Sequence, residues 1–185
     1  MTTGDDQTGA LPVEDSLEAL FRELAAGRTA SLDGVWRACA DHLYGLALWR
    51  TRSVSDAQDA VQEVFVRLAR RGPKLSRVRD PRAYLLRMTR NAAADIASRR
   101  RDEPLGDEIP SLVELDSVES RIDARRASVL IVDLPAGQRE VVFLREFVGL
   151  SFRRIAEVCG IPLFTAASRH RLAIRRLRRL LGVEQ

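Results

Sequence analysis

Residues 151–181 read SFRRIAEVCGIPLFTAASRHRLAIRRLRRLL, an order that predicts two helices joined by a tight turn. Ser151 can cap the first helix, and Gly160 can form the turn that follows it. Ile161 is then expected to fill the angle between the helices, and Thr165 to cap the second helix. Together these positions predict a helix-turn-helix motif.

The second helix of this motif divides into a packing face and a cationic face. At about 100° per residue, one sector collects Ala166, His170, Ala173, Ile174, Leu177, Leu180 and Leu181. The opposite side carries Ser168, Arg171, Arg175, Arg178 and Arg179, and the span from Thr165 to Leu181 contains six arginines and no acid.

The cationic face suits the major groove of DNA. Arginine pairs bidentately with guanine edges, and a carboxylate on this face would repel phosphate. Arg169 and Arg176 flank the face and are expected to hold phosphates. The alternative is a solvated basic face on a purely structural helix.

Composition limits the class of protein. The 185 residues are 45% hydrophobic, with a formal net charge of +4, which is enough for one ordinary domain or two small ones with real cores. The two cysteines, Cys39 and Cys159, lie far apart and the only histidines are His42 and His170, so we expect no zinc site, no disulfide and no cofactor. No apolar run approaches membrane-spanning length, so we expect a cytoplasmic protein without membrane insertion.

Helical spacing recurs along the N-terminal half, and strand-like alternation is absent. One long helix should bury Leu32, Val35, Trp36, Cys39, Leu43, Leu46 and Ala47. A second should follow an N-cap at Ser55, end before Gly72–Pro73 and bury Ala57, Ala60, Val61, Val64, Phe65 and Leu68. A third should begin at Asp80–Pro81 and turn inward Tyr84, Leu85, Met88, Ala92 and Ile96.

An acidic segment separates this half from the C-terminal motif. Residues 102–119 contain seven acids, two prolines and no basic residue, a composition typical of an extended linker. We therefore expect an all-α fold of two small helical domains joined by a flexible acidic linker. The expected divisions are a disordered tail at 1–15, a domain at 16–101, the linker at 102–118 and the helix-turn-helix domain at 119–185, with helices near 119–132 and 136–148.

Two segments carry a resemblance to a known family. They are DAQDAVQEVFVRL, residues 56–68, and RNAAADIASRRR, residues 90–101, followed across the linker by the helix-turn-helix. In this order they resemble a bacterial extracytoplasmic-function (ECF) sigma factor over about residues 30–181. Such proteins are small, two-domain specificity subunits of RNA polymerase, so the resemblance implies promoter-specific transcription initiation.

The resemblance also implies a role for individual residues. The polar face of the second helix would bind the clamp helices of the polymerase largest subunit, through Asp56, Asp59, Gln62 and Glu63. The minus-ten element of promoter DNA would meet a loop and the helix after it, at Arg77, Arg79, Arg87, Arg90 and Asn91. The minus-thirty-five element would meet the last helix, at Thr165, Ser168, Arg169, Arg171, Arg175 and Arg176.

Some positions depart from the family pattern, and two other functions stay open. Phe164 stands where the family has a small or polar residue, so its bulk is expected to alter the turn, and Arg154 stands where glutamate is commoner. A sigma-like decoy would bind an anti-sigma factor without touching DNA, and a stand-alone helix-turn-helix regulator would need no polymerase-binding helix. An anti-sigma factor is also a possible partner of a working sigma factor. The sequence has no phosphate-binding glycine loop, nucleophile elbow or metal-spaced cluster, so we expect no enzyme activity.

Overall fold

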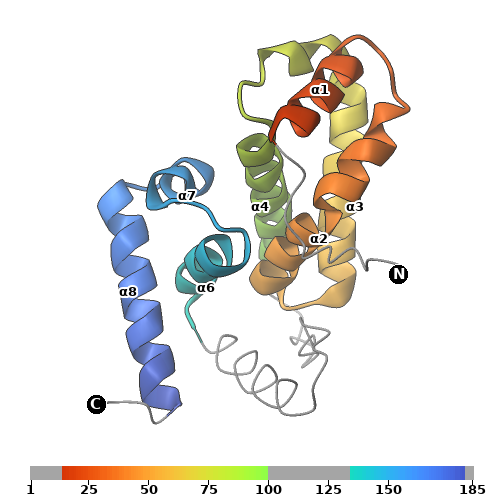
Figure 1. The fold of residues 1–185 in the computed structure, drawn as a ribbon. Helices are drawn as coiled ribbons and strands as arrows, with labels where there is room; N and C mark the ends of the chain where they lie inside the picture. The colour runs from red at the N-terminus through yellow and green to blue at the C-terminus, as the bar shows by residue number, and fades with distance from the viewer. Residues whose placement is uncertain (1–13, 100–133, 182–185) are drawn as a thin grey trace, which may run out of the picture.

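The computed structural model describes residues 14–99 and 134–181, and all regular secondary structure in these ranges is helical (Figure 1). The N-terminal range forms α1 (Glu14–Ala25), α2 (Ser31–Thr51), α3 (Val54–Arg71), the 3-10 helix η1 (Gly72–Arg77) and α4 (Pro81–Arg99). The C-terminal range forms α6 (Ala136–Val142), the π-helix η2 (Phe143–Phe147), α7 (Phe152–Cys159) and α8 (Leu163–Leu180). The expected all-α architecture is thus confirmed, while most of the predicted tail and all of the linker at 102–118 lie outside the described residues.

Helices α2, α3 and α4 form a bundle around apolar side chains, with α1 packed across it next to η1 (Figure 1). Local sequence explains where these helices begin. Asp80 accepts a hydrogen bond from the backbone N–H of Ala83 at 2.9 Å, so it caps α4 ahead of Pro81 as predicted. The cap of α3 is Ser53, whose Oγ accepts from the backbone N–H of Asp56 at 3.3 Å, so the prediction of Ser55 was wrong.

One further expectation of the helical pattern was wrong. Trp36 does not belong to the buried stripe of α2, because its side chain is 45% exposed and packs beside Phe65, with the ring centroids 4.9 Å apart. The helix expected near 136–148 is present, and its α-helical part ends at Val142. The backbone N–H of Val148 then reaches the Phe143 carbonyl at 3.2 Å, a wider turn that continues the chain as a π-helix.

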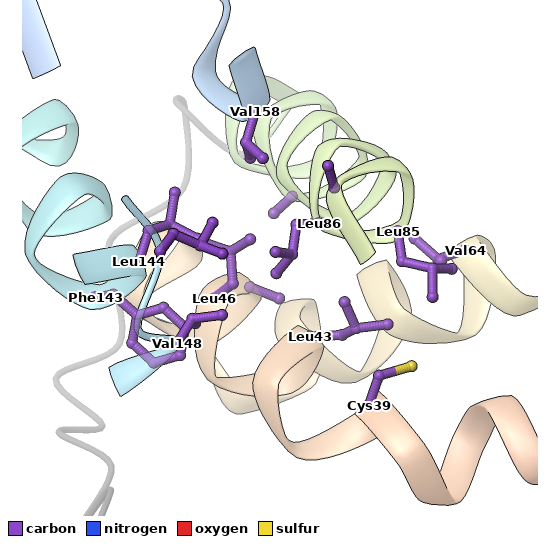
Figure 2. Close-up of a cluster of buried hydrophobic side chains, with 14 of the residues drawn as sticks. Cys39, Leu43, Leu46, Val64, Leu85, Leu86, Phe143, Leu144, Val148 and Val158 are labelled. Carbon is purple, nitrogen blue, oxygen red and sulfur yellow. The ribbon is translucent and has the colours of Figure 1, made fainter. Parts of the chain in front are cut away.

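The two described ranges share one continuous apolar core. In Figure 2, Phe143, Leu144 and Val148 of the C-terminal range lie against Leu46 and Leu86 of the N-terminal bundle, and all five are almost fully buried. α6 packs on α2, and α7 packs on α4. The C-terminal helices are therefore held against the bundle by burial of apolar side chains from both partners.

Candidate nucleic-acid interface

The first helix of the helix-turn-helix and its turn are built as predicted. The Oγ of Ser151 accepts a hydrogen bond from the backbone N–H of Arg154 at 3.3 Å and so caps α7. Gly160 ends α7 with φ of +64°, a left-handed conformation that glycine adopts without steric cost. Ile161 is half-buried against the apolar core, between the two helices. These three positions confirm the motif.

The second helix, α8, begins earlier than predicted. Its N-cap is Pro162, with φ −60° and ψ 147°, and Thr165 lies half-buried inside the first turn, so the prediction that Thr165 caps α8 was wrong. The physical reason is local, because proline fixes φ near −65° and the extended ψ is the usual N-cap backbone. Phe164 also lies in this first turn, and its ring points away from the protein, with 88% of its surface exposed. Its bulk does not disturb the turn.

α8 has the packing face and the cationic face that the sequence predicts. Ala166 and Ala173 are fully buried against the rest of the C-terminal unit, as predicted. The basic face carries Ser168, Arg171 and Arg175, and all three are exposed. Leu180 and Leu181 were expected in the packing sector but are 45% and 50% exposed, because the end of α8 runs past α6 (Figure 1).

The two arginines that flank the basic face have different surroundings. Arg169 is half-buried and lies over the first turn of α6, where a Cβ added at Gly137 would be 3.0 Å from its Nη1. Arg176 is exposed. Arg169 is therefore held against a neighbouring helix, whereas Arg176 is exposed to solvent. The spacing of the sequence does not distinguish these two arginines.

The predicted minus-ten residues of η1, α4 and the loop between them fall into two groups. Arg77 and Arg79 are exposed, and so is Asn91. Arg87 is also exposed, but its Nη2 donates to the backbone carbonyl of Glu157 in α7 at 2.9 Å. The predicted minus-ten side of α4 is therefore partly covered, because α7 packs against it.

Arg90 is further withdrawn from solvent. Its side chain is 22% exposed, and its Nε lies 2.6 Å from Oε1 of Glu140 in α6. Glu140 is 2% exposed, and its other carboxylate oxygen lies 3.3 Å from Nη1 of Arg50 in α2. A buried carboxylate is costly unless paired, and two guanidinium groups from the N-terminal bundle supply the pairing. Arg90 of α4 is thus held by an ion pair with α6.

The neighbouring Arg139 forms a second polar contact at the same interface. Its Nε donates to the backbone carbonyl of Trp49 at 2.9 Å and its Nη1 to that of Leu134 at 2.6 Å. Burial, together with the positive charges of Arg52 and Arg50, lowers the pKa of Arg139 to about 10. Arg139 therefore keeps its charge at neutral pH.

The polar face of α3 is smaller than predicted. Asp59 and Gln62 are exposed, and the side chain of Glu63 is half-exposed with its Oε1 2.6 Å from Nε of Arg67. Asp56 is only 4% exposed, so its placement on this face was wrong. Asp56 precedes the buried Ala60 by four residues and therefore lies on the inward side of the first turn.

Comparison with known proteins agrees with this arrangement. Residues 35–103 match the family described as Sigma-70 region 2, and residues 125–177 match Sigma-70, region 4. The ECF RNA polymerase sigma factor SigM of Mycobacterium tuberculosis is 30% identical over 172 residues, which cover 91% of this chain and 86% of SigM. The chain belongs to the ECF RNA polymerase sigma factors. Sigma factors bind core RNA polymerase and promoter DNA and direct promoter-specific initiation.

Two further proteins are similar to this sigma factor. The ECF RNA polymerase sigma factor SigC of Mycobacterium tuberculosis is 28% identical over 160 residues, covering 84% of this chain and 86% of SigC. The sigma factor RpoE, solved in complex with the anti-sigma factor NepR from Bartonella quintana, matches with a TM-score of 0.65 at 22% identity. That match covers 94% of this chain and 100% of RpoE, and it concerns the fold alone.

The sequence alone did not reveal the residues that join the N-terminal range, 14–99, to the C-terminal range, 134–181. Glu140 and its partner Arg50 are separated by 90 residues, so no local spacing relates them. One signal was present, because Arg139 and Glu140 immediately precede the apolar run Val141–Leu144. Charged residues beside such a run are buried when the run packs, and buried charges need partners.

Within residues 14–99 and 134–181, no helix has both the length and the apolar character needed to cross a bilayer. In the same ranges, no three or more His, Cys, Asp and Glu residues are grouped so that they could hold a metal ion.

Proposed function

We propose that this sigma factor binds core polymerase through the exposed side of α3, at Asp59, Gln62 and Glu63. The partner surface would be the clamp helices of the largest subunit. Two properties support this assignment: the three side chains reach solvent on one helix, and none of them packs in the core. Asp56 is left out of the contact, because its side chain is buried.

The exposed face of α8 reads the minus-thirty-five element in the major groove. Ser168, Arg171 and Arg175 contact base edges, while Arg176 holds phosphate. Thr165 and Arg169 are half-buried, and they contact the DNA from the edge of this face that adjoins the packed side of α8. The observation that carries this proposal is an exposed basic face without any acid, on a helix whose opposite side is buried at Ala166 and Ala173.

The minus-ten element binds η1, the loop that follows it and α4. The side chains that contact it are Arg77, Arg79, Arg87, Arg90 and Asn91. Of these, Arg87 and Arg90 contact α7 and α6. Promoter binding by all five side chains therefore requires α6 and α7 to move off α4. The chain itself performs no chemical step, because nucleotide transfer belongs to the polymerase, and it acts in the bacterial cytoplasm.

An anti-sigma factor is a second proposed partner. The support comes from fold likeness, since RpoE was solved in complex with the anti-sigma factor NepR. A decoy that binds only an anti-sigma factor would not need arginines on α8. The exposed guanidinium groups of Arg171, Arg175 and Arg176 therefore favour a working sigma factor.

Runoff transcription with purified core polymerase on a pool of genomic promoters tests the proposal. The wild-type protein should yield a small set of specific transcripts. Reversal of charge at Asp59→Lys and Glu63→Lys should abolish co-purification with core polymerase and leave far-ultraviolet circular dichroism unchanged. The matched control reverses two exposed acids elsewhere, Glu18→Lys on α1 and Asp95→Lys on α4. Equal co-purification of the two double variants would refute the assignment of α3.

DNA reading by α8 is tested on promoters that differ only in the upstream element. Arg171→Ala or Arg175→Ala should relax preference at particular base pairs, by about 1–3 kcal/mol each. Arg176→Ala should instead weaken binding to all upstream sequences alike and lower the salt dependence by about one phosphate contact. Wild-type discrimination by both the Arg171 and Arg175 variants would make this face a phosphate-binding surface only.

A further inference from the structure

Phe164 has no structural task in the protein. Its side chain is 88% exposed, whereas the next most exposed large apolar side chain of the described residues, Leu181, is 50% exposed. Phe164 lies in the first turn of α8, and the cap of that turn is Pro162. Because the ring contributes neither to the core nor to the turn, it is available for contact with a partner, which would remove its apolar surface from water.

The position of the ring on α8 points to the partner. Arg171 follows Phe164 by about two helical turns and Arg175 by about three, so the three side chains form one row along the helix. Ala166 and Ala173, on the opposite side, are fully buried. In helix-turn-helix proteins the N-terminal residues of the second helix contact base edges. The ring thus stands at the N-terminal end of the row proposed to read bases.

The chemistry of the ring selects among the base edges of the major groove. Phenylalanine has no hydrogen-bonding group, so it holds no phosphate and pairs with no donor or acceptor edge. The only apolar group that a base pair presents in the major groove is the C5-methyl of thymine, and phenylalanine is one of the side chains that contact it. The seven-residue step between Phe164 and Arg171 spans about 10 Å, or about three base pairs.

We propose that Phe164 is a specificity-determining residue that recognises the methyl group of a thymine in the upstream promoter element, within about three base pairs of the pair read by Arg171. This inference rests on the proposed reading of that element by α8. It adds an apolar contact to a face otherwise made of guanidinium and hydroxyl groups. The expected upstream sequence therefore contains a thymine whose methyl group matters.

Replacement of thymine by deoxyuridine isolates this contact, because it removes the methyl group and leaves the hydrogen-bonding edge unchanged. The holoenzyme of core polymerase and the full chain is assayed on a promoter obtained from the runoff experiment, with each upstream thymine replaced in turn. At one position the wild-type affinity should fall about fourfold, the factor that corresponds to burial of one methyl group. The Phe164→Ala holoenzyme should show no such fall at that position.

Control variants separate this contact from general effects on α8. Leu180→Ala removes a half-exposed apolar side chain at the far end of the same helix and should keep the fourfold preference for thymine. Arg175→Ala should also keep it, while losing preference at a different base pair. Association with core polymerase should be equal for the wild type and Phe164→Ala, since the ring is assigned to DNA.

The alternatives give different results. If every single deoxyuridine substitution leaves the wild-type affinity unchanged, or if Phe164→Ala retains the penalty, the ring does not read thymine and the inference is wrong. Weaker association of Phe164→Ala with core polymerase, at unchanged thymine preference, would assign the ring to a protein contact and also overturn it. If the Arg171 and Arg175 variants also keep full discrimination among upstream sequences, the proposed base reading by α8 as a whole is wrong. If only the thymine test at Phe164 fails, base reading by the arginines still stands.

Discussion

Substitution of Gly45 by alanine tests whether η2 packs on α2. Its effect on the free energy of unfolding should be destabilising when Phe143 is present and stabilising when Phe143 is absent. Gly45 lies inside α2, and a Cβ added there would be 2.6 Å from Cζ and 2.9 Å from Cε2 of Phe143. The Phe143 ring is 4% exposed and stacks on Phe147, with Trp49 5.1 Å away on another side. Because Trp49 and Phe147 pack against the ring, the added methyl group should push η2 away from α2.

Two opposing terms decide the magnitude. Alanine in place of glycine within a helix stabilises by about 0.5–1 kcal/mol. Forcing an extra methyl group into a packed core costs about 1–3 kcal/mol. Since the overlap with Phe143 involves a confined ring, we expect the second term to win, and Gly45→Ala should lower the free energy of unfolding of the full chain by about 1–2 kcal/mol.

Urea unfolding of the full chain, followed by circular dichroism, measures this difference. Gly34→Ala is the matched control in the same helix, because its Cβ would meet the mobile end of Leu20 and should be tolerated. In a Phe143→Ala background, Gly45→Ala should become stabilising by about 0.5–1 kcal/mol, since only helix propensity remains. If Gly45→Ala stabilises the wild-type chain as well, Phe143 does not pack on α2 in solution and the reasoning is refuted.

Two other expectations follow from buried groups. Glu140→Ala removes the buried carboxylate between Arg50 and Arg90. It should lower the free energy of unfolding of the full chain by about 3–5 kcal/mol, measured by urea unfolding. An unchanged urea midpoint would contradict the pairing. Burial raises the pKa of the Cys39 and Cys159 thiols to about 12, for Cys159 with help from the charge of Glu140, so neither should form much thiolate at pH 8. Alkylation at pH 8 should therefore be slow in the native protein and fast in guanidinium, and equal rates in the two conditions would show that the thiols are accessible.

Features that depend on a few neighbouring residues were determined by the sequence alone. Ser151 and Asp80 cap α7 and α4 through bonds to residues three positions ahead, and Gly160 ends α7 in the conformation predicted for it. The burial of Ala166 and Ala173 follows from helical periodicity. The basic face of α8 and the polar face of α3 were readable for the same reason, apart from Asp56.

Features that depend on residues far apart in the chain were decided only by the tertiary structure. Nothing within a few residues of Arg90 indicates that its guanidinium faces Glu140, because that carboxylate is brought near only when α6 packs on the bundle. The same packing buries Phe143 against Gly45. Helical periodicity predicts which face of a helix is apolar. Which other helix packs against that face depends on how apolar surfaces and buried charges are matched across the whole chain.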